Sequence, residues 1–179
     1  IRDRDKMGIR ASATAEIIFE DCFVPDSARA GKEGRGFMIA MQTLQMSRPV
    51  VAAISVGIAQ AAIEAAVAYS HHRKQFGVKI ATFEMVQQMI ADMVMKTEAA
   101  RILTYKACVA QMNKDKKAGL YSAMSKCFAS DTAMEVTTTA VQVMGGNGYS
   151  RENPVEKYMR IYEGTNQVQR LVIANETTF

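Results

Sequence analysis

Apolar residues recur at helical spacing along most of the chain from Phe37 onward. In the stretch that follows Ile80, for example, Val86, Ile90 and Met93 fall on one side of a helix. The pattern predicts three long helices and two short ones, over residues 37–74, 80–113, 118–144, 154–160 and from 165 onward. Helices of this length joined by short connections predict an antiparallel four-helix bundle, and therefore a mainly α fold.

Proline and glycine mark boundaries within this helical part. Pro49 lies inside the first predicted helix, and because proline removes one backbone hydrogen bond, we expect a kink or a local break there. The third long helix is expected to end at Met144, since the residues that follow are Gly145-Gly146-Asn147-Gly148 and glycine commonly terminates helices.

Residues 1–30 show a different pattern. Ala13–Glu20 and Cys22–Pro25 are short, favour strands and are bounded by turn residues, so they predict one or two strands. Because two strands do not form an independent sheet, we expect a short N-terminal β remnant, the end of a β-domain whose remainder lies outside this sequence. Residues 31–37 are glycine-rich but lack the Gly-Lys-Ser/Thr and G-x-G-x-x-G patterns, and are interpreted as a hinge. The helical domain is therefore expected over 31–179.

Composition narrows the function classes. Apolar residues make up 49% of the chain, which is ample for a core. The net charge is +4 without a basic block, so nucleic-acid binding is not expected, whereas a mildly basic surface suits an anionic nucleotide cofactor. The longest weakly charged stretch, Pro49–Ile63, is too short for a membrane span. His71 and His72 are adjacent and point to different sides of a helix, so no metal site is predicted.

Near the C-terminus, Glu163 precedes Gly164 and Thr165 at the expected start of the last helix. Thr165 is a plausible N-cap, with Val168 and Leu171 on the apolar face behind it. A carboxylate at such a helix start could act as a base. The alternative is structural, since an acidic residue near a helix N-terminus stabilises the helix by about 0.3–1 kcal/mol.

Several motifs in one fixed order carry a resemblance to a known family. They are Gly8-Ile9-Arg10-Ala11-Ser12, Phe19-Glu20-Asp21 with Val24-Pro25, Gly31 to Phe37, Arg73-Lys74-Gln75-Phe76-Gly77, Val141 to Gly148, and Tyr162-Glu163-Gly164-Thr165. Together they resemble the C-terminal half of the acyl-CoA dehydrogenases over essentially the whole chain. The resemblance implies that residues 1–30 end the middle β-domain and that 31–179 form the C-terminal four-helix bundle.

The resemblance also implies a function. Members of the family bind FAD and remove two hydrogens from the α and β carbons of an acyl-CoA thioester, and electrons then pass to an electron-transferring flavoprotein. Most are homotetramers built as a dimer of dimers, and the bacterial cytoplasm or the mitochondrial matrix is the expected location. The chain resembles the short- and medium-chain types.

The substrate residues follow from the motif matches. Glu163 matches the catalytic base that takes the α-proton, and burial in a dry acyl pocket would raise its basicity. In one branch of the family the base instead precedes Arg48, but that position here is Ser47, which cannot serve. Arg48, Tyr162 and Gly164 match residues beside the substrate, and Gly164 would allow its close approach.

The cofactor residues form three groups in the resemblance. Arg73 and Gln75 would hold the FAD pyrophosphate, with Phe76 packed beside the cofactor. A second group, Gln142, Gly145 and Gly146, would cradle the adenosine end from a neighbouring subunit. A third group, Thr165, Asn166 and Gln167, would offer a helix start to the pyrophosphate or ribityl. Structural alternatives stay open, namely a helix-end cation for Arg73, a C-cap for Gly145-Gly146 and an N-cap for Thr165.

The sequence departs from the family pattern at three points. About six residues of the form Asp-Ala-Lys-Ile-x-Gln are missing between Arg160 and Ile161, which would shorten a helix by about 9 Å. Glu84 stands where the family usually has Gln near FAD, and Gln45 replaces the Asp three residues before Arg48.

Two functional hypotheses result. The first is an FAD-dependent acyl-CoA dehydrogenase of which these residues form the C-terminal part, with little or no activity expected of the 179-residue chain alone because the other domains supply much of the site. The alternative is a truncated, non-catalytic helical assembly module of the same family, which associates with itself but does not hold flavin.

Overall fold

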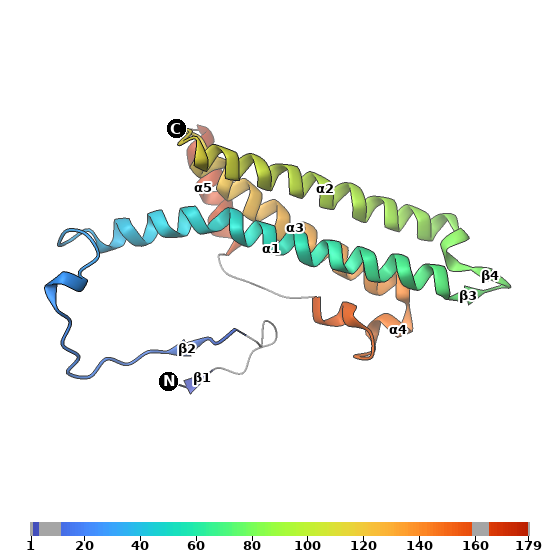
Figure 1. Ribbon diagram of the computed structural model, residues 1–179. Helices are drawn as coiled ribbons and strands as arrows, with labels where there is room; N and C mark the ends of the chain where they lie inside the picture. The colour runs from blue at the N-terminus through green and yellow to red at the C-terminus, as the bar shows by residue number, and fades with distance from the viewer. Residues whose placement is uncertain (1, 4–11, 159–164, 179) are drawn as a thin grey trace.

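The computed structural model describes residues 2–3, 12–158 and 165–178. Three long helices, α1 (Gly36–His72), α2 (Glu84–Met112) and α3 (Ala118–Met144), lie side by side and form the body of the molecule (Figure 1). A shorter helix, α5 (Asn166–Thr178), packs on α3 near the α2–α3 connection. The predicted mainly α bundle is confirmed, and α3 is its central element because it contacts α1, α2 and α5.

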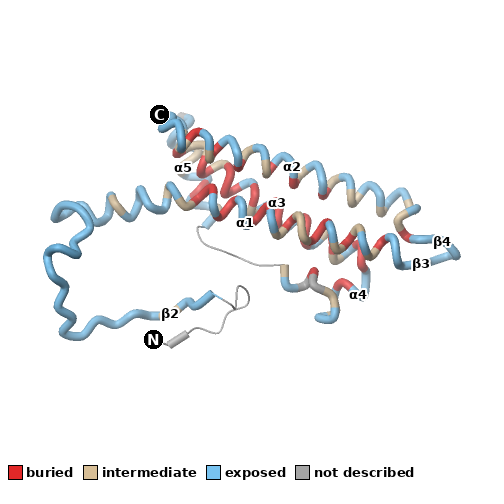
Figure 2. The backbone as a smooth tube through the Cα atoms, in the orientation of Figure 1, coloured by how far each residue is buried: buried red, intermediate tan, exposed pale blue. Residues whose placement is uncertain are grey.

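The core of the bundle is built largely from small residues. Alanines at the helix contacts have almost no exposed surface, which allows the helices to approach closely: Ala52, Ala59, Ala62, Ala66, Ala100, Ala107, Ala123, Ala129 and Ala140. Larger side chains such as Met93, Val136 and Val155 fill the remaining space. Figure 2 shows the buried residues concentrated where the long helices meet.

Pro49 does not interrupt α1, which runs from Gly36 to His72. Because proline has no backbone N–H, the carbonyl of Gln45 loses its helical partner. Gln111 on α2 replaces that partner, since its Nε2 donates to the Gln45 carbonyl at 2.8 Å and to Ser122 Oγ at 2.9 Å. A side chain from the neighbouring helix thus supports α1 at the position where a kink or break was expected.

The connection between α1 and α2 is a β-hairpin that the pattern did not predict. Strand β3 (Lys74–Gln75) pairs with β4 (Val78–Lys79), and a 3-10 turn, η2 (Ile80–Thr82), leads into α2. The two turn residues, Phe76 and Gly77, have φ values of +50° and +81°, as the tight hairpin turn with positive φ at both positions requires. The helices predicted over 37–74 and 80–113 are therefore shorter at this connection.

The N-terminal part extends away from the bundle as an arm (Figure 1). Strand β1 (Arg2–Asp3) pairs with β2 (Ala15–Glu16), and the chain continues through a short 3-10 helix, η1 (Asp26–Ala28), to α1. Of the strands predicted over 13–20 and 22–25, only Ala15–Glu16 is paired. Phe19 and Phe23 are 75% and 89% exposed. The assignment of residues 1–30 to a middle β-domain remains a prediction.

The chain after α3 is short and closely packed. It forms α4 (Gly146–Tyr149) and η3 (Pro154–Tyr158), which contact α3, and η3 also contacts α1. The predicted short helix over 154–160 is thus a 3-10 turn in its described part, and α4 was not predicted.

By length and composition alone, α1 is apolar enough to cross a membrane, with a mean hydropathy of 1.9 over its most apolar window. Of that window, 44% is buried inside the molecule. The same properties are typical of the central helices of a bundle, and α1 contacts both α2 and α3.

Candidate functional site

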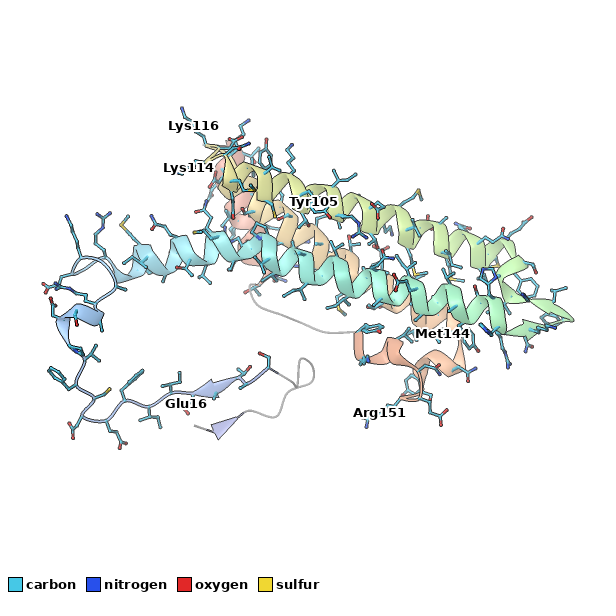
Figure 3. The ribbon with its side chains drawn as sticks, viewed as in Figure 1. Glu16, Tyr105, Lys114, Lys116, Met144 and Arg151 are labelled. Atoms are coloured by element: carbon cyan, nitrogen blue, oxygen red, sulfur yellow. The ribbon has the colours of Figure 1, made fainter. Side chains whose placement is uncertain are left out.

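A pocket of about 400 Å³ opens where the end of α1, the β3–β4 hairpin and the end of α3 meet. Residues of these segments, of η2 and of the first turns of α2 and α4 line it: Tyr69, Arg73, Gln75, Ile80, Phe83, Val86, Gln142, Val143, Met144, Gly145, Gly146 and Asn147. Figure 3 labels Met144 at the end of α3, where the chain turns into α4. Because α1 and α3 run in the same direction, their C-terminal ends lie at the same end of the bundle (Figure 1). The predicted cofactor residues Arg73, Gln75, Gln142, Gly145 and Gly146 therefore line one pocket.

The backbone conformation of Gly145 and hydrogen bonds from two asparagines fix the glycine-rich turn on one side of this pocket. Gly145 ends α3 with φ +59° and ψ −138°, a conformation that residues with a side chain rarely adopt. Asn147 Nδ2 donates to the Tyr69 hydroxyl at 2.5 Å, and Asn153 Nδ2 donates to the Asn147 carbonyl at 2.7 Å. At Gly148 a Cβ atom would lie 2.6 Å from the Val141 carbonyl oxygen, so the turn cannot accept a larger residue without shifting.

The chemistry of the pocket fits FAD. Arg73 supplies a guanidinium suited to two-point contact with phosphate, and Gln75 and Gln142 supply carboxamides. Gly145 and Gly146 have open space where a Cβ would stand, so a ligand can approach their backbone. Ile80 and Phe83 add apolar surface for a planar ring. The Arg73 backbone is fixed on both sides, because its N–H donates to Tyr69 O and its carbonyl accepts from Ile80 N.

Phe76 and Glu84 lie beside this pocket but do not line it. Phe76 is at the hairpin tip, 94% exposed, and its ring meets Phe83 edge to face at 6.3 Å between centroids. Glu84 is the first residue of α2 and is exposed, where a carboxylate favours the helix dipole. The departure from the family's Gln at this position therefore places no carboxylate in the lining.

Arg48 lies in a second pocket, of about 340 Å³, between the first half of α1 and α5. Arg48 is 8% exposed, and the other lining residues are mostly apolar or amide-bearing: Phe37, Met38, Met41, Gln42, Gln45, Val172 and Glu176. Gln45 and Glu176 close over Gly119, where a Cβ would lie 2.8 Å from each side chain. The sequence pattern did not predict this pocket, although Met38 and Met41 at helical spacing are a signal for an adaptable apolar surface.

The start of α5 lies apart from the pocket at Arg73. Thr165 immediately precedes the helix, and its carbonyl accepts from the Gln169 N–H at 3.2 Å. Asn166 contacts α3 at Ser130, twelve residues before Gln142, which is about 18 Å along a helix. The cofactor residues predicted from the resemblance thus form two separate groups within one chain.

The contacts of Asn166 were not predicted. Its Oδ1 accepts from Lys126 Nζ at 2.6 Å, and its Nδ2 donates to Ser130 Oγ at 2.8 Å and to Asp131 Oδ1 at 2.6 Å. Arg170, one turn further along α5, donates to Asp131 Oδ2 at 2.5 Å. The one sequence signal for this contact is Lys126, a lysine inside an Ala- and Ser-rich run. In the structure this lysine is 3% exposed.

The surroundings of this contact shift the pKa values of two ionisable groups, Cys127 and Arg170. Burial is the main cause that raises the pKa of the Cys127 thiol, and the negative charge of Asp131 adds to it, whereas Arg170 and Lys126 act in the opposite direction. The hydrogen bond to Asp131 raises the pKa of Arg170.

The remaining predicted residues, Tyr162, Glu163 and Gly164, lie outside the described residues. So does the junction of Arg160 and Ile161, where the resemblance predicts a departure from the family pattern. Among residues 2–3, 12–158 and 165–178, no group of three His, Cys, Asp or Glu side chains is arranged to hold a metal ion.

Comparison with known proteins gives a consistent match. The family model for "Acyl-CoA dehydrogenase, C-terminal domain" matches residues 34–178. The chain is 51% identical over 175 residues to "Probable acyl-CoA dehydrogenase FadE25" of Mycobacterium tuberculosis, covering 94% of this chain and 45% of that protein. The chain therefore spans about half the length of the curated relatives it matches.

Solved structures agree with the sequence match. Butyryl-CoA dehydrogenase from Megasphaera elsdenii has a TM-score of 0.94 at 47% identity, over 98% of this chain and 47% of that one. A chain from work on the electron transferring flavoprotein of Acidaminococcus fermentans also has a TM-score of 0.94, at 52% identity, over 99% of this chain and 48% of that one.

Proposed function

We propose, from the premise that this chain belongs to the acyl-CoA dehydrogenase family, that the whole protein is an FAD-dependent dehydrogenase of short- or medium-chain acyl-CoA thioesters. The observation that carries the proposal is the pocket at Arg73. Residues far apart in the sequence meet there with the guanidinium of Arg73, the carboxamides of Gln75 and Gln142 and an accessible glycine backbone, which suit an anionic dinucleotide. The similarity to butyryl-CoA dehydrogenase supports the substrate class.

Each residue has a distinct role in the proposed reaction. Glu163 takes the proton from the α-carbon, which is acidic only through the adjacent thioester, and a water-poor surrounding would strengthen this base. Arg48 and the pocket around it would bind and orient the substrate, with Tyr162 lining the site and Gly164 leaving space for the thioester. FAD, when bound, supplies the acceptor for the hydride from the β-carbon.

The two groups of cofactor residues support a site shared between copies of the chain. Arg73 and Gln142 are exposed in the single chain, and Asn166 contacts α3 about 18 Å away. We therefore propose that Arg73, Gln75, Phe76, Gln142, Gly145 and Gly146 of one copy and the start of α5 of another face one FAD. At the start of α5 the contacts would come from the side chains of Thr165 and Gln167 and from the backbone of Asn166, whose side chain is engaged with α3. A homotetramer built as a dimer of dimers provides such pairs.

The proposal extends to partners and location. An electron-transferring flavoprotein would accept the electrons, in keeping with the similarity to a chain from work on such a flavoprotein. The bacterial cytoplasm or the mitochondrial matrix is the proposed location.

The base assignment is tested by Glu163→Gln in the whole protein. This variant should keep its FAD and lose turnover of butyryl-CoA by at least about 100-fold, because the amide cannot accept the α-proton. Glu152→Gln, an exposed carboxylate eleven residues earlier, is the control and should turn over like wild type. Retained turnover in Glu163→Gln would overturn the assignment, and a colourless, stable oligomer of wild type would favour the non-catalytic assembly module.

A further inference from the structure

A polar cluster joins the first turn of α5 to the middle of α3. We call it the α5 anchor and define it as Lys126, Ser130 and Asp131 on α3 with Asn166 and Arg170 on α5. The carboxamide of Asn166 is at its centre, with its oxygen toward Lys126 and its two N–H groups toward Ser130 and Asp131. Each polar atom of this side chain is therefore engaged with α3.

Holding two helices together through the α5 anchor costs desolvation free energy, because it buries a charged group. Lys126 is 3% exposed, and a buried ammonium loses most of its hydration. An apolar side chain of similar length would pack there without that cost. Buried polar groups with every hydrogen bond made instead favour one arrangement of the elements that carry them, because any shift leaves a buried group unpaired.

The anchor holds one end of the segment that contains Glu163. Asn166 follows Glu163 by three residues, and on the other side of the segment Val155 is fully buried in the core cluster beside Val143 and Met144. Both flanks of residues 159–164 are therefore attached to α3. A displacement of the first turn of α5 would therefore also displace the backbone that leads from α5 back to Glu163.

We propose that the α5 anchor positions Glu163 for proton abstraction, and that the side chain of Asn166 serves this purpose rather than contact with the cofactor. Lys126 and Asn166 are positioning residues, since they act through the backbone of α5. The proposal rests on the proposed function, because it takes Glu163 as the base.

The direct test uses Lys126→Met and Asn166→Asp in the whole protein. Asn166→Asp keeps an oxygen for Lys126 but replaces the N–H donors with a carboxylate that faces Asp131. Both variants should lower kcat for butyryl-CoA on the order of 10- to 100-fold, with KM and FAD content unchanged. Hydrogen exchange, followed by mass spectrometry, should become faster in a peptide that spans residues 159–168.

Exchanging the two side chains tests whether the lost hydrogen bond causes the fall in kcat. A double variant should recover activity that a mere loss of packing would not let it recover. In Asn166→Asp with Asp131→Asn, the exchanged side chains again form a donor–acceptor pair, so kcat should rise above that of Asn166→Asp. If the Lys126 variant does not fold, Ser130→Ala removes one contact of the same cluster and should show a smaller loss in the same direction.

Two controls separate positioning from general destabilisation. Val136→Ala opens a cavity in the core away from α5 and should lower Tm with kcat unchanged. Lys96→Met breaks the ion pair between Lys96 on α2 and Glu135 on α3, which does not involve α5, and should leave kcat and exchange at 159–168 unchanged.

The outcomes are distinct. Wild-type kcat in Lys126→Met and Asn166→Asp, together with an inactive Glu163→Gln, would overturn the anchor and leave the proposed function standing. Loss of FAD from Asn166→Asp with normal kcat per bound flavin would instead assign Asn166 to the cofactor and overturn the anchor. An active Glu163→Gln would overturn the proposed function itself.

Discussion

At the residue scale, one hydrogen bond replaces what Pro49 removes from α1. Gln111 Nε2 reaches the Gln45 carbonyl across the helix interface, and Ser122 shares the same donor. This contact fixes α1 beside Arg48, which lines the second pocket. A residue that weakens its own helix is thereby tolerated because the neighbouring helix supplies the missing donor.

Gln111→Leu should therefore destabilise the fold by about 1–3 kcal/mol, because it leaves a partly buried carbonyl without its donor. The effect should shrink in the Pro49→Ala background, where the residue 49 N–H can again bond to the Gln45 carbonyl. Urea unfolding of the four variants of this cycle measures the coupling. Equal losses in both backgrounds would show that Gln111 acts elsewhere.

The Cys127 thiol provides a second prediction at this scale. Because burial raises its pKa above 9.0 in the folded state, the protonated thiol is favoured by folding. The stability that it contributes is fully present below about pH 9 and is lost as the pH rises through the folded-state pKa. Urea unfolding at several pH values should show a fall above pH 9 that is smaller in Cys127→Ala.

The same burial predicts slow alkylation of Cys127. Exposed Cys22 should react with iodoacetamide first and Cys127 last in the folded protein, because the thiolate is the reactive form. Peptide mass spectrometry over time measures the order. Equal rates for the two residues would contradict the raised pKa and the burial.

At the element scale, the end of α3 forms one wall of the proposed FAD pocket. Gly145 adopts φ +59° and ψ −138° there, and the next residues are tied to Tyr69 through Asn147. The direction in which the chain leaves α3 is therefore set by one glycine.

Gly145→Ala should strain this turn by about 1–3 kcal/mol and reduce the FAD content of the whole protein. Gly57→Ala is a matched control, since Gly57 is an exposed helical residue with open space around a Cβ, and the substitution should stabilise α1 slightly. The absorbance ratio of flavin to protein measures the effect. A full flavin load in Gly145→Ala would show that the turn is not needed for binding.

The long helices could be predicted within a few residues because their apolar spacing is a local property of the sequence. The β3–β4 hairpin could not, since strands of two residues have no periodicity, and Gly77 was its only signal. The strands expected over 13–25 are mostly unpaired because pairing depends on a partner that local pattern does not contain.

The site shows the same division between local and tertiary information. The residues of the Arg73 pocket could be named from motifs, and they meet because α1 and α3 run in the same direction and end beside one another. The α5 anchor could not be predicted, because Lys126 and Asn166 meet only once α5 packs on α3.

At the scale of the whole molecule, the bundle presents surfaces that a single chain leaves open. Large apolar side chains on the outer side of α2 are exposed, among them Ile102 at 65% and Met112 at 81%, and the N-terminal arm exposes Phe23. Exposed apolar surface of this extent is typical of association with further protein. It accords with the proposed tetramer and with the proposed β-domain around residues 1–30.

The proposed function makes the whole protein a flavin-dependent acyl-CoA dehydrogenase that holds its flavin in the pocket at Arg73. The most direct measurement is the visible spectrum of the purified whole protein during anaerobic addition of butyryl-CoA. We expect flavin absorbance that bleaches on addition of the thioester, and we expect the Arg73→Met variant to be purified with little flavin. A protein without flavin, or flavin that is unchanged by short- and medium-chain acyl-CoA, would contradict it.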